Sequence, residues 1–274
     1  MESRIIRRKP RSAGSRFQSY IKNSDISKEK PEKNLLSGCR KRTGGRNCYG
    51  RITTRHIGGG VDRKYRMIDF LRSEREFSGV INSIQYDPNR NVLIALIFYP
   101  NGKKQYILLP EGLKVGDVVA AGENVEVAVG NCLPLQNIPI GFMIHNIEMV
   151  PGGSGKLIRA AGLSAQLMAK ENGYAVVKMP SGELRMINLK CWATIGILSN
   201  GAFKNISIGK AGRNRRKGIR PSVRGMAMNP VDHPRGGGEG KTKSGSFPIS
   251  PWGTCVFGKK TRKRKNRFVI KYRK

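Results

Sequence analysis

The sequence predicts a mainly β chain in which two small barrels in tandem lie between long, irregular, basic extensions. Three observations predict this class. Short apolar runs separated by turn residues fill the middle of the chain, no stretch sustains a helical period, and Lys and Arg gather toward both ends. Helix content is therefore expected to be low.

The charge distribution separates the middle of the chain from its ends. The 274 residues carry a formal net charge of +34, which points to nucleic acid or an anionic membrane surface. Segments 1–60, 61–183 and 184–274 carry net charges of +12, +1 and +21. Because such ends repel themselves in free solution, we expect them to order on a polyanionic partner. No membrane partner is expected, since the longest apolar run, 92–99, is far too short to cross a bilayer.

The first barrel is predicted from five short strands. The turn residues at 87–90 and 101–102 join the first three strands into a meander, and two further runs could complete a closed sheet. Five strands of this kind suit an oligonucleotide-binding (OB) barrel. The expected strands are 80–86, 92–99, 105–109, 115–120 and 125–129.

A second strand series has the spacing of a small SH3-like barrel, with strands expected at 145–150, 165–169, 174–179, 184–189 and 194–198. Pro134 and Pro139 interrupt strand pairing and place the boundary between the barrels near them. The predicted domains are a basic N-terminal extension (1–60), an OB barrel (61–130), an SH3-like barrel (131–200) and a basic, Gly/Arg-rich C-terminal extension (201–274).

The stretch 209–242 has too many glycines, prolines and charges for a helix or a buried sheet, yet it is too varied for a flexible linker. A loop of this length needs an outside partner to hold its shape. In the N-terminal extension, glycines between 44 and 60 let the backbone lie close to another surface while arginines reach phosphates. Both extensions therefore predict binding to a polyanion.

Enzymatic and metal-binding interpretations fit less well. The Gly-Lys-Thr at 240–242 lacks the earlier glycine of a phosphate-binding loop, because Arg235 stands there, and the glycine-rich stretch 152–156 lacks the following Ser or Thr. Cys39, Cys48 and His56 are too widely spaced for a structural zinc site. The five scattered cysteines do not suggest a disulfide framework and favour a reducing compartment.

Asp232 and His233 suggest a possible catalytic pair, because a carboxylate can orient an imidazole base. No partner nucleophile is evident, and the surroundings are glycine and arginine rather than an apolar pocket. His145, between apolar residues of a predicted strand, is expected to be structural.

RNA binding accounts for more of the chain. Arg and Lys supply salt-dependent phosphate contacts, and Asn, His and Thr can bond 2′-hydroxyls and base edges. Aromatic residues are scarce in the basic ends, which favours a folded RNA over a stacked single strand. The candidate RNA-binding residues are Arg46, Arg51, Arg55, His56, Arg90, Lys156, Arg159, Lys210, Arg213, Arg215, Arg216, Arg220, Arg224, His233, Arg235 and Lys241.

Six motifs follow one another along the chain. They are Gly-Arg-Ile-Thr-Thr-Arg-His-Ile-Gly-Gly-Gly (50–60), Tyr-Asp-Pro-Asn-Arg (86–90), Leu-Pro-Leu-Gln-Asn-Ile-Pro-Ile-Gly (133–141), Arg-Ala-Ala-Gly (159–162), Gly-Lys-Ala-Gly (209–212) and the stretch 223–240 with Asn-Pro-Val-Asp-His-Pro-Arg-Gly-Gly-Gly. In this order they resemble the L-two family of large-subunit ribosomal proteins, in its bacterial or organellar form. The resemblance spans nearly the whole chain and leaves only the first thirty or so residues and the last dozen loosely matched.

The resemblance implies an OB barrel followed by an SH3-like barrel, with both extensions in large-subunit rRNA near the peptidyl-transferase centre. It implies support of subunit association, tRNA binding and translation, with the chemistry done by RNA. By motif position, Arg90 and Arg159 are implied rRNA contacts whose loss lowers affinity with little loss of fold, and His233 has a positioning role. Arg235 and Arg216 depart from the family, which usually has His and often Trp there.

The implied partners are large-subunit rRNA, neighbouring ribosomal proteins and small-subunit rRNA across the subunit interface, with no homo-oligomer. No cofactor is expected, with Mg²⁺ present only as an rRNA counter-ion. The implied location is the ribosome of a bacterial cytoplasm or of an organelle matrix, mitochondrial or plastid. The alternatives left open are an RNA-binding or chaperone protein outside the ribosome, and an enzyme that uses His233.

Overall fold

The computed structural model describes residues 4–22, 24–38, 43–239, 247–257, 262 and 264–272. The chain forms two compact units: Met1–Lys41 with Asp62–Arg213 and Arg267–Lys274, and Arg42–Val61 with Asn214–Asn266. The protein is mainly β with curled sheets, as predicted. Within the described residues, no helix is long and apolar enough to cross a membrane. Four cysteines, Cys48, Cys132, Cys191 and Cys255, are free thiols.

A four-stranded antiparallel sheet forms the first barrel region of the first unit. One of its two inner strands, β6 (Ile94–Phe98), is buried along almost its whole length. Ala95 and Ile97 pack into one apolar cluster, while Ile94 and Leu96 pack into another. Alternate side chains of one strand thus reach two separate cores, which explains why an apolar run here forms a strand. The strand order is β7-β6-β5-β8, with β5 (Gly79–Gln85), β6 (Ile94–Phe98), β7 (Lys104–Leu108) and β8 (Val118–Val119).

The two turns of this meander form as predicted. The Asn89 N–H donates to the Asp87 carboxylate over 2.8 Å, and the Lys103 N–H donates to the Asn101 side chain over 3.0 Å. Gly102 follows with φ of 77°, a backbone conformation that glycine adopts without strain.

The fifth predicted strand, 125–129, is wrong, because the structure has turns and irregular backbone there. The Asn131 side chain accepts the Ala120 N–H over 2.9 Å and donates to the Glu126 carbonyl over 3.0 Å. These bonds hold the segment in a loop, so local side-chain chemistry overrides the strand pattern. The fourth predicted strand is shorter than expected, because a turn with Gly116 at φ of 96° precedes it.

The second strand series forms a seven-stranded sheet of the first unit. Its strands agree with four of the five predicted runs to within a few residues. The predicted strand 145–150 is divided between β10 (Met143–His145) of this sheet and β11 (Ile147–Glu148), which lies in a separate two-stranded sheet. Pro134 ends the edge strand β9, where a missing N–H costs no ladder bond. The order is β17-β15-β14-β13-β10-β16-β9, with β9 (Cys132–Pro134), β10 (Met143–His145), β13 (Ala165–Glu171), β14 (Tyr174–Lys178), β15 (Leu184–Asn188), β16 (Trp192–Ile195) and β17 (Val269–Lys271).

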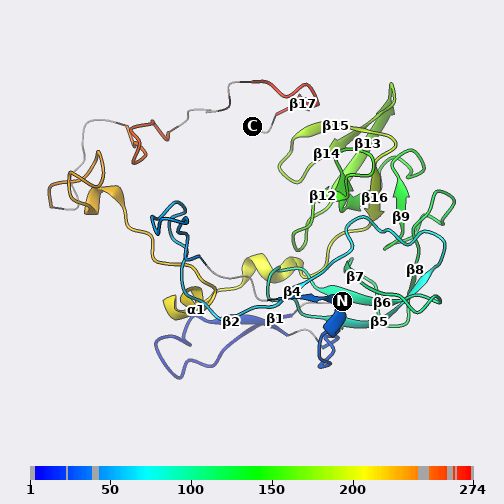
Figure 1. Ribbon diagram of the computed structural model, residues 1–274, viewed down its shortest axis with the longest axis horizontal. Coiled ribbons are helices and arrows are strands. Elements are labelled where there is room, and N and C mark those ends of the chain that lie inside the picture. The colour runs from blue at the N-terminus through cyan, green and yellow to red at the C-terminus, as the bar shows by residue number, and fades with distance from the viewer. Residues whose placement is uncertain are drawn as a thin grey trace. The chain divides into compact units, whose positions relative to one another are not determined.

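The edge strand β17 comes from the C-terminal tail, which was predicted to be part of an irregular basic extension. Figure 1 shows it beside β15, and Val269 pairs with Arg185. Val269 is buried, and the Phe268 ring lies 6.2 Å from the Tyr174 ring. Apolar residues within the basic tail therefore pack this part of it onto the seven-stranded sheet.

His145 is structural, as expected. Its side chain is 1% exposed, and its Nδ1 lies 2.9 Å from the Gly196 carbonyl oxygen. Burial lowers the pKa of His145 to about 4, and the bond to Gly196 opposes that shift only in part. The ring is therefore neutral at pH 7 and donates from Nδ1.

Short elements complete the fold. The stretch 209–242 contains a six-residue helix, α1 (Ala211–Arg216), so the prediction of no helix there is wrong. Alanine and arginine are good helix formers, and Gly218, with φ of 89°, lies shortly after the end of the helix. The remaining elements are β1 (Arg4–Arg7) paired with β2 (Ser19–Lys22), β3 (Leu36–Ser37) paired with β4 (Tyr65–Arg66), β11 (Ile147–Glu148) paired with β12 (Gly155–Leu157), and the 3-10 turns η1 (Lys33–Leu35), η2 (Gly201–Asn205) and η3 (Gly225–Ala227), with α1 at Ala211–Arg216.

Candidate nucleic-acid interface

Three of the predicted contact residues gather around Phe70 in the first unit. The Arg159 guanidinium carbon lies 4.5 Å from the centre of the Phe70 ring, and that of Arg90 lies 5.6 Å from it. Lys156 is exposed on β12, whose Gly155 N–H donates to the Phe70 carbonyl over 3.0 Å. Motifs far apart in the sequence therefore meet at one aromatic residue and form a basic cluster, which we call the Phe70 cluster.

Arg90 differs from Arg159 in its surroundings. Its Nε donates to the Asp87 carboxylate over 2.6 Å, and the Asp87 side chain is 0% exposed whereas that of Arg90 is 17% exposed. Arg159 is exposed and rests on Phe70. Arg90 is thus part of a buried ion pair, and removing it leaves a buried carboxylate without its partner. This changes the expectation that Arg90 can be replaced with little loss of fold.

In the second unit, the N-terminal and C-terminal extensions are hydrogen-bonded to each other. The Gly58 N–H donates to the Gly218 carbonyl over 2.9 Å, and the Arg220 N–H donates to the His56 carbonyl over 3.0 Å. A side chain on Gly58 would come within 3.1 Å of Arg220, and one on Gly218 within 3.2 Å of the Gly59 carbonyl. Glycine is favoured at Gly218, where φ is 89° and the neighbour is backbone, whereas the atoms near Gly58 belong to the Arg220 side chain, which can move aside.

This pairing collects eight predicted contact residues on the second unit. Arg215 is half-buried, and its guanidinium donates to the Gly58 carbonyl over 3.4 Å. Arg55 lies over the exposed ring of Trp252, with 5.2 Å between the guanidinium carbon and the ring centre. The other members are exposed to solvent, which leaves their side chains available to RNA; they are Arg46, Arg51, His56, Arg216, Arg220 and Arg224.

The His233 loop, residues 225–237, is held by its own hydrogen bonds. The His233 side chain is 8% exposed, and its Nδ1 accepts the Arg235 N–H over 3.1 Å. The neutral ring therefore carries its proton on Nε2. A side chain on Gly225 would lie 2.4 Å from the ring, and the Gly237 N–H donates to the Met228 carbonyl over 3.0 Å. These contacts shape the loop from within, and the outside partner expected for the stretch 209–242 stays a prediction.

The remaining predicted residues lie elsewhere. Lys210 is exposed in the first unit, where its side chain packs against Gly14, and the half-buried Arg213 donates to the Ile208 carbonyl over 3.4 Å. Arg235 is half-buried in the His233 loop. Lys241 lies outside the described residues.

Sequence reasoning missed the residues that position these cations. Phe70 and Trp252 each lie beneath an arginine, and Asp87 holds Arg90. Asp87 belongs to a turn motif that was recognised, so its role could have been inferred from its spacing to Arg90. The contacts of Phe70 and Trp252 join segments distant in sequence and left no local signal.

Two family models match the chain. The description "Ribosomal Proteins L2, RNA binding N-terminal domain" belongs to the model that matches residues 32–121, and "Ribosomal Proteins L2, C-terminal domain" to the model that matches residues 128–253. The matches follow one another without overlap and together span most of the chain. The Phe70 cluster draws residues from both of them.

Proposed function

This chain belongs to the ribosomal protein L2 family, and from that premise we propose that it binds large-subunit rRNA near the peptidyl-transferase centre and supports subunit association, tRNA binding and translation. As a member of the family it is an RNA-binding protein of the large ribosomal subunit, found in the ribosome with rRNA and other ribosomal proteins as partners. The observation that carries the proposal is the hydrogen-bonded meeting of the two basic extensions in the second unit.

That meeting supports binding to folded RNA rather than loose electrostatic attraction. A disordered tail loses much conformational entropy when it binds, whereas backbone bonds such as Gly58 to Gly218 order this one in advance. The exposed arginines then project from ordered backbone. An ordered backbone that carries several cations suits the fixed phosphate positions of a folded RNA.

The Phe70 cluster provides a second contact surface. The Arg159 guanidinium carbon lies 4.5 Å from the centre of the Phe70 ring, close enough for a cation–π contact, and the residue stays exposed. Lys156 lies on the neighbouring strand as a mobile point charge. We assign both side chains to rRNA phosphates, and Arg90 to a combined role in structure and contact.

We assign no catalytic residue to the chain. A general base at His233 would need an unprotonated Nε2, whereas the Nδ1 of this ring accepts the Arg235 N–H. Asp232 is exposed. The hydrogen bond that orients the His233 ring is donated by the Arg235 backbone N–H and does not involve the Asp232 carboxylate. The His233 loop therefore positions RNA, and RNA carries out peptidyl transfer.

Further parts of the proposal extend the family assignment. The chain is divided into 1–60, 61–130, 131–200 and 201–274 as the sequence predicts, it contacts small-subunit rRNA across the subunit interface, and it enters the ribosome as a single copy without forming homo-oligomers. Mg²⁺ enters only as an rRNA counter-ion. The compartment is a bacterial cytoplasm or an organelle matrix.

Hydroxyl-radical footprinting of large-subunit rRNA tests the location. Subunits reconstituted with the full chain are compared with subunits that lack it. We expect the protected nucleotides to include those lining the peptidyl-transferase centre, and His233→Ala to lose part of that protection. Protection confined to sites remote from the centre contradicts the location. Peptide-bond formation by the purified chain without RNA, if abolished in His233→Ala, establishes the enzymatic alternative instead.

A further inference from the structure

The N-terminal hairpin lies before the residues that the family models match, and it carries a basic pocket. Strands β1 and β2 pair antiparallel, with Ile5 opposite Ile21 and Arg7 opposite Ser19. The loop between them continues the pairing, because the Arg8 N–H donates to the Gln18 carbonyl over 2.9 Å. This basic segment therefore forms a β-hairpin.

One buried hydroxyl organises the turn of the hairpin. The Ser15 side chain accepts the N–H groups of Arg11 and Ser12 over 3.1 and 2.9 Å, and its hydroxyl donates to the Ser12 carbonyl over 3.0 Å. Ser15 is 9% exposed. Because three hydrogen bonds converge on one side chain, Ser15 fixes the backbone from which Arg11 projects.

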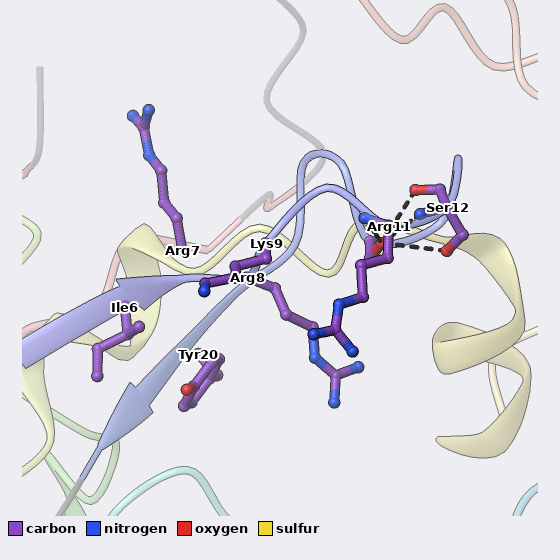
Figure 2. A pocket seen from close by; sticks show the side chains of 8 residues that line it. Ile6, Arg7, Arg8, Lys9, Arg11, Ser12 and Tyr20 are labelled. Atoms are coloured by element: carbon purple, nitrogen blue, oxygen red, sulfur yellow. Dashed lines mark hydrogen bonds between the residues drawn. The ribbon is translucent and has the colours of Figure 1, made fainter.

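The pocket beside this turn has a volume of about 530 Å³. Figure 2 shows the side chains of Arg8 and Arg11 extending from the loop in the same direction, with Tyr20 nearby, while Arg7 extends the other way. The Arg8 guanidinium is oriented by a bond of 3.4 Å to the Gln18 side chain. The lining residues are Ile6, Arg7, Arg8, Lys9, Arg11, Ser12, Ser15 and Tyr20.

The charges of this pocket lack local compensation. The sequence from residue 3 to residue 24 contains seven Lys and Arg residues and no Asp or Glu. Two guanidinium groups that extend to the same side repel each other, and an anion placed between them relieves that repulsion through charge-assisted hydrogen bonds. Arginine presents a planar fork that matches the oxygens of a phosphate.

We propose that this pocket is a binding site for backbone phosphates of large-subunit rRNA, with Arg8 and Arg11 as its contacts and Ser15 as a positioning residue. The proposal rests on the proposed function and adds a site to it. Tyr20 and Ile6 provide an apolar wall against which a ribose can pack.

The pocket is also joined to the start of the C-terminal extension. The Ser19 N–H donates to the Ser207 carbonyl over 3.0 Å, and the Ser207 N–H donates to the Ser19 hydroxyl over 2.7 Å. A side chain on Gly209 would lie 2.9 Å from both the Gly14 carbonyl and Gln18. RNA held in the pocket therefore also fixes the backbone that leads into α1.

The test measures affinity of the full chain for large-subunit rRNA as a function of salt concentration. Arg8→Ala and Arg11→Ala are each expected to weaken binding about tenfold and to lower the slope of log affinity against log salt by about 1. Arg16→Ala is the matched control, because Arg16 is exposed on the same turn but does not line the pocket. Ser15→Ala keeps every charge and is expected to weaken binding about fivefold by releasing the turn.

If the hairpin binds RNA only through its overall charge, the variants are expected to change rRNA affinity in a different way. If Arg16→Ala weakens binding as much as Arg8→Ala and Arg11→Ala do, or if Ser15→Ala binds like the wild type, the pocket is not a site. Thermal unfolding of each variant confirms that the barrels are intact. The proposed function is tested separately, by the preference of the wild-type chain for large-subunit rRNA over an unrelated structured RNA of equal length.

Discussion

Replacing Arg90 by alanine is expected to destabilise the first unit as well as to weaken RNA binding. The Asp87 carboxylate is fully buried and lies 2.6 Å from the Arg90 Nε, so the substitution leaves a buried carboxylate without its ion-pair partner. Breaking a buried pair by removing one partner costs about 3–5 kcal/mol, which is a large part of the 5–15 kcal/mol that stabilises a typical domain. Loss of the cation over Tyr65 and Phe70 adds a smaller cost.

Urea denaturation of the full chain, followed by circular dichroism, measures this cost. The double variant Asp87→Asn with Arg90→Ala is the informative control. Asparagine keeps the oxygen that accepts the Asn89 N–H over 2.8 Å but carries no charge. The double variant is therefore expected to be more stable than Arg90→Ala alone by about 1–3 kcal/mol. The reasoning is refuted if Arg90→Ala lies within about 0.5 kcal/mol of the wild type, the range of ordinary surface substitutions.

Three further predictions concern the remaining sites. Arg159→Ala should lower the slope of log rRNA affinity against log salt by about 1 and leave the unfolding free energy nearly unchanged, because the side chain is exposed; unchanged binding removes it from the interface. Burial lowers the pKa of His145 from 6.5 to about 4, so as the pH falls the unfolded chain takes up a proton before the folded chain does. The unfolding free energy is therefore expected to fall between about pH 6.5 and about pH 4, by up to about 3 kcal/mol. His145→Gln should flatten this dependence in titrated denaturation curves, and an equal slope in both proteins contradicts it. Gly225→Ala should place a methyl group against the His233 ring and weaken rRNA binding without changing charge, as measured by filter binding; wild-type affinity means that the shape of the loop does not matter.

Most strands could be predicted because their signals are local. Asn101 and Gly102 mark a turn by their own side-chain and backbone preferences, and the run 92–99 is apolar because both faces of β6 are buried. The strand predicted at 125–129 failed because Asn131, outside the run, bonds its backbone into a loop.

The extensions were predicted less well than the barrels. Their charge indicated a polyanionic partner, but charge does not reveal which backbone segments pair. The Tyr106 hydroxyl accepts the Glu32 N–H over 3.0 Å, and Val269 is buried at the edge of a sheet. Both extensions therefore contribute to the folded body, and truncation at residues 60 and 201 removes parts of it as well as RNA contacts.

The candidate contacts themselves could be chosen by residue type, spacing and resemblance, yet their roles could not. Arg90 and Arg159 look equivalent in the sequence, whereas one is held by a buried carboxylate and the other is exposed. The roles of Ser15, Phe70 and Trp252 could not be predicted, because they arise from a turn or from contacts between segments distant in sequence.

Sedimentation of large subunits through high salt, with the amount of this chain quantified against rRNA, decides whether the protein is a built-in constituent. Because preordered extensions make many simultaneous contacts with folded RNA, we expect one copy of the chain to stay with each subunit after washing. A chain that washes off, or that distributes over all RNA in proportion to its mass, is a loosely bound basic protein, and that result contradicts the proposed function.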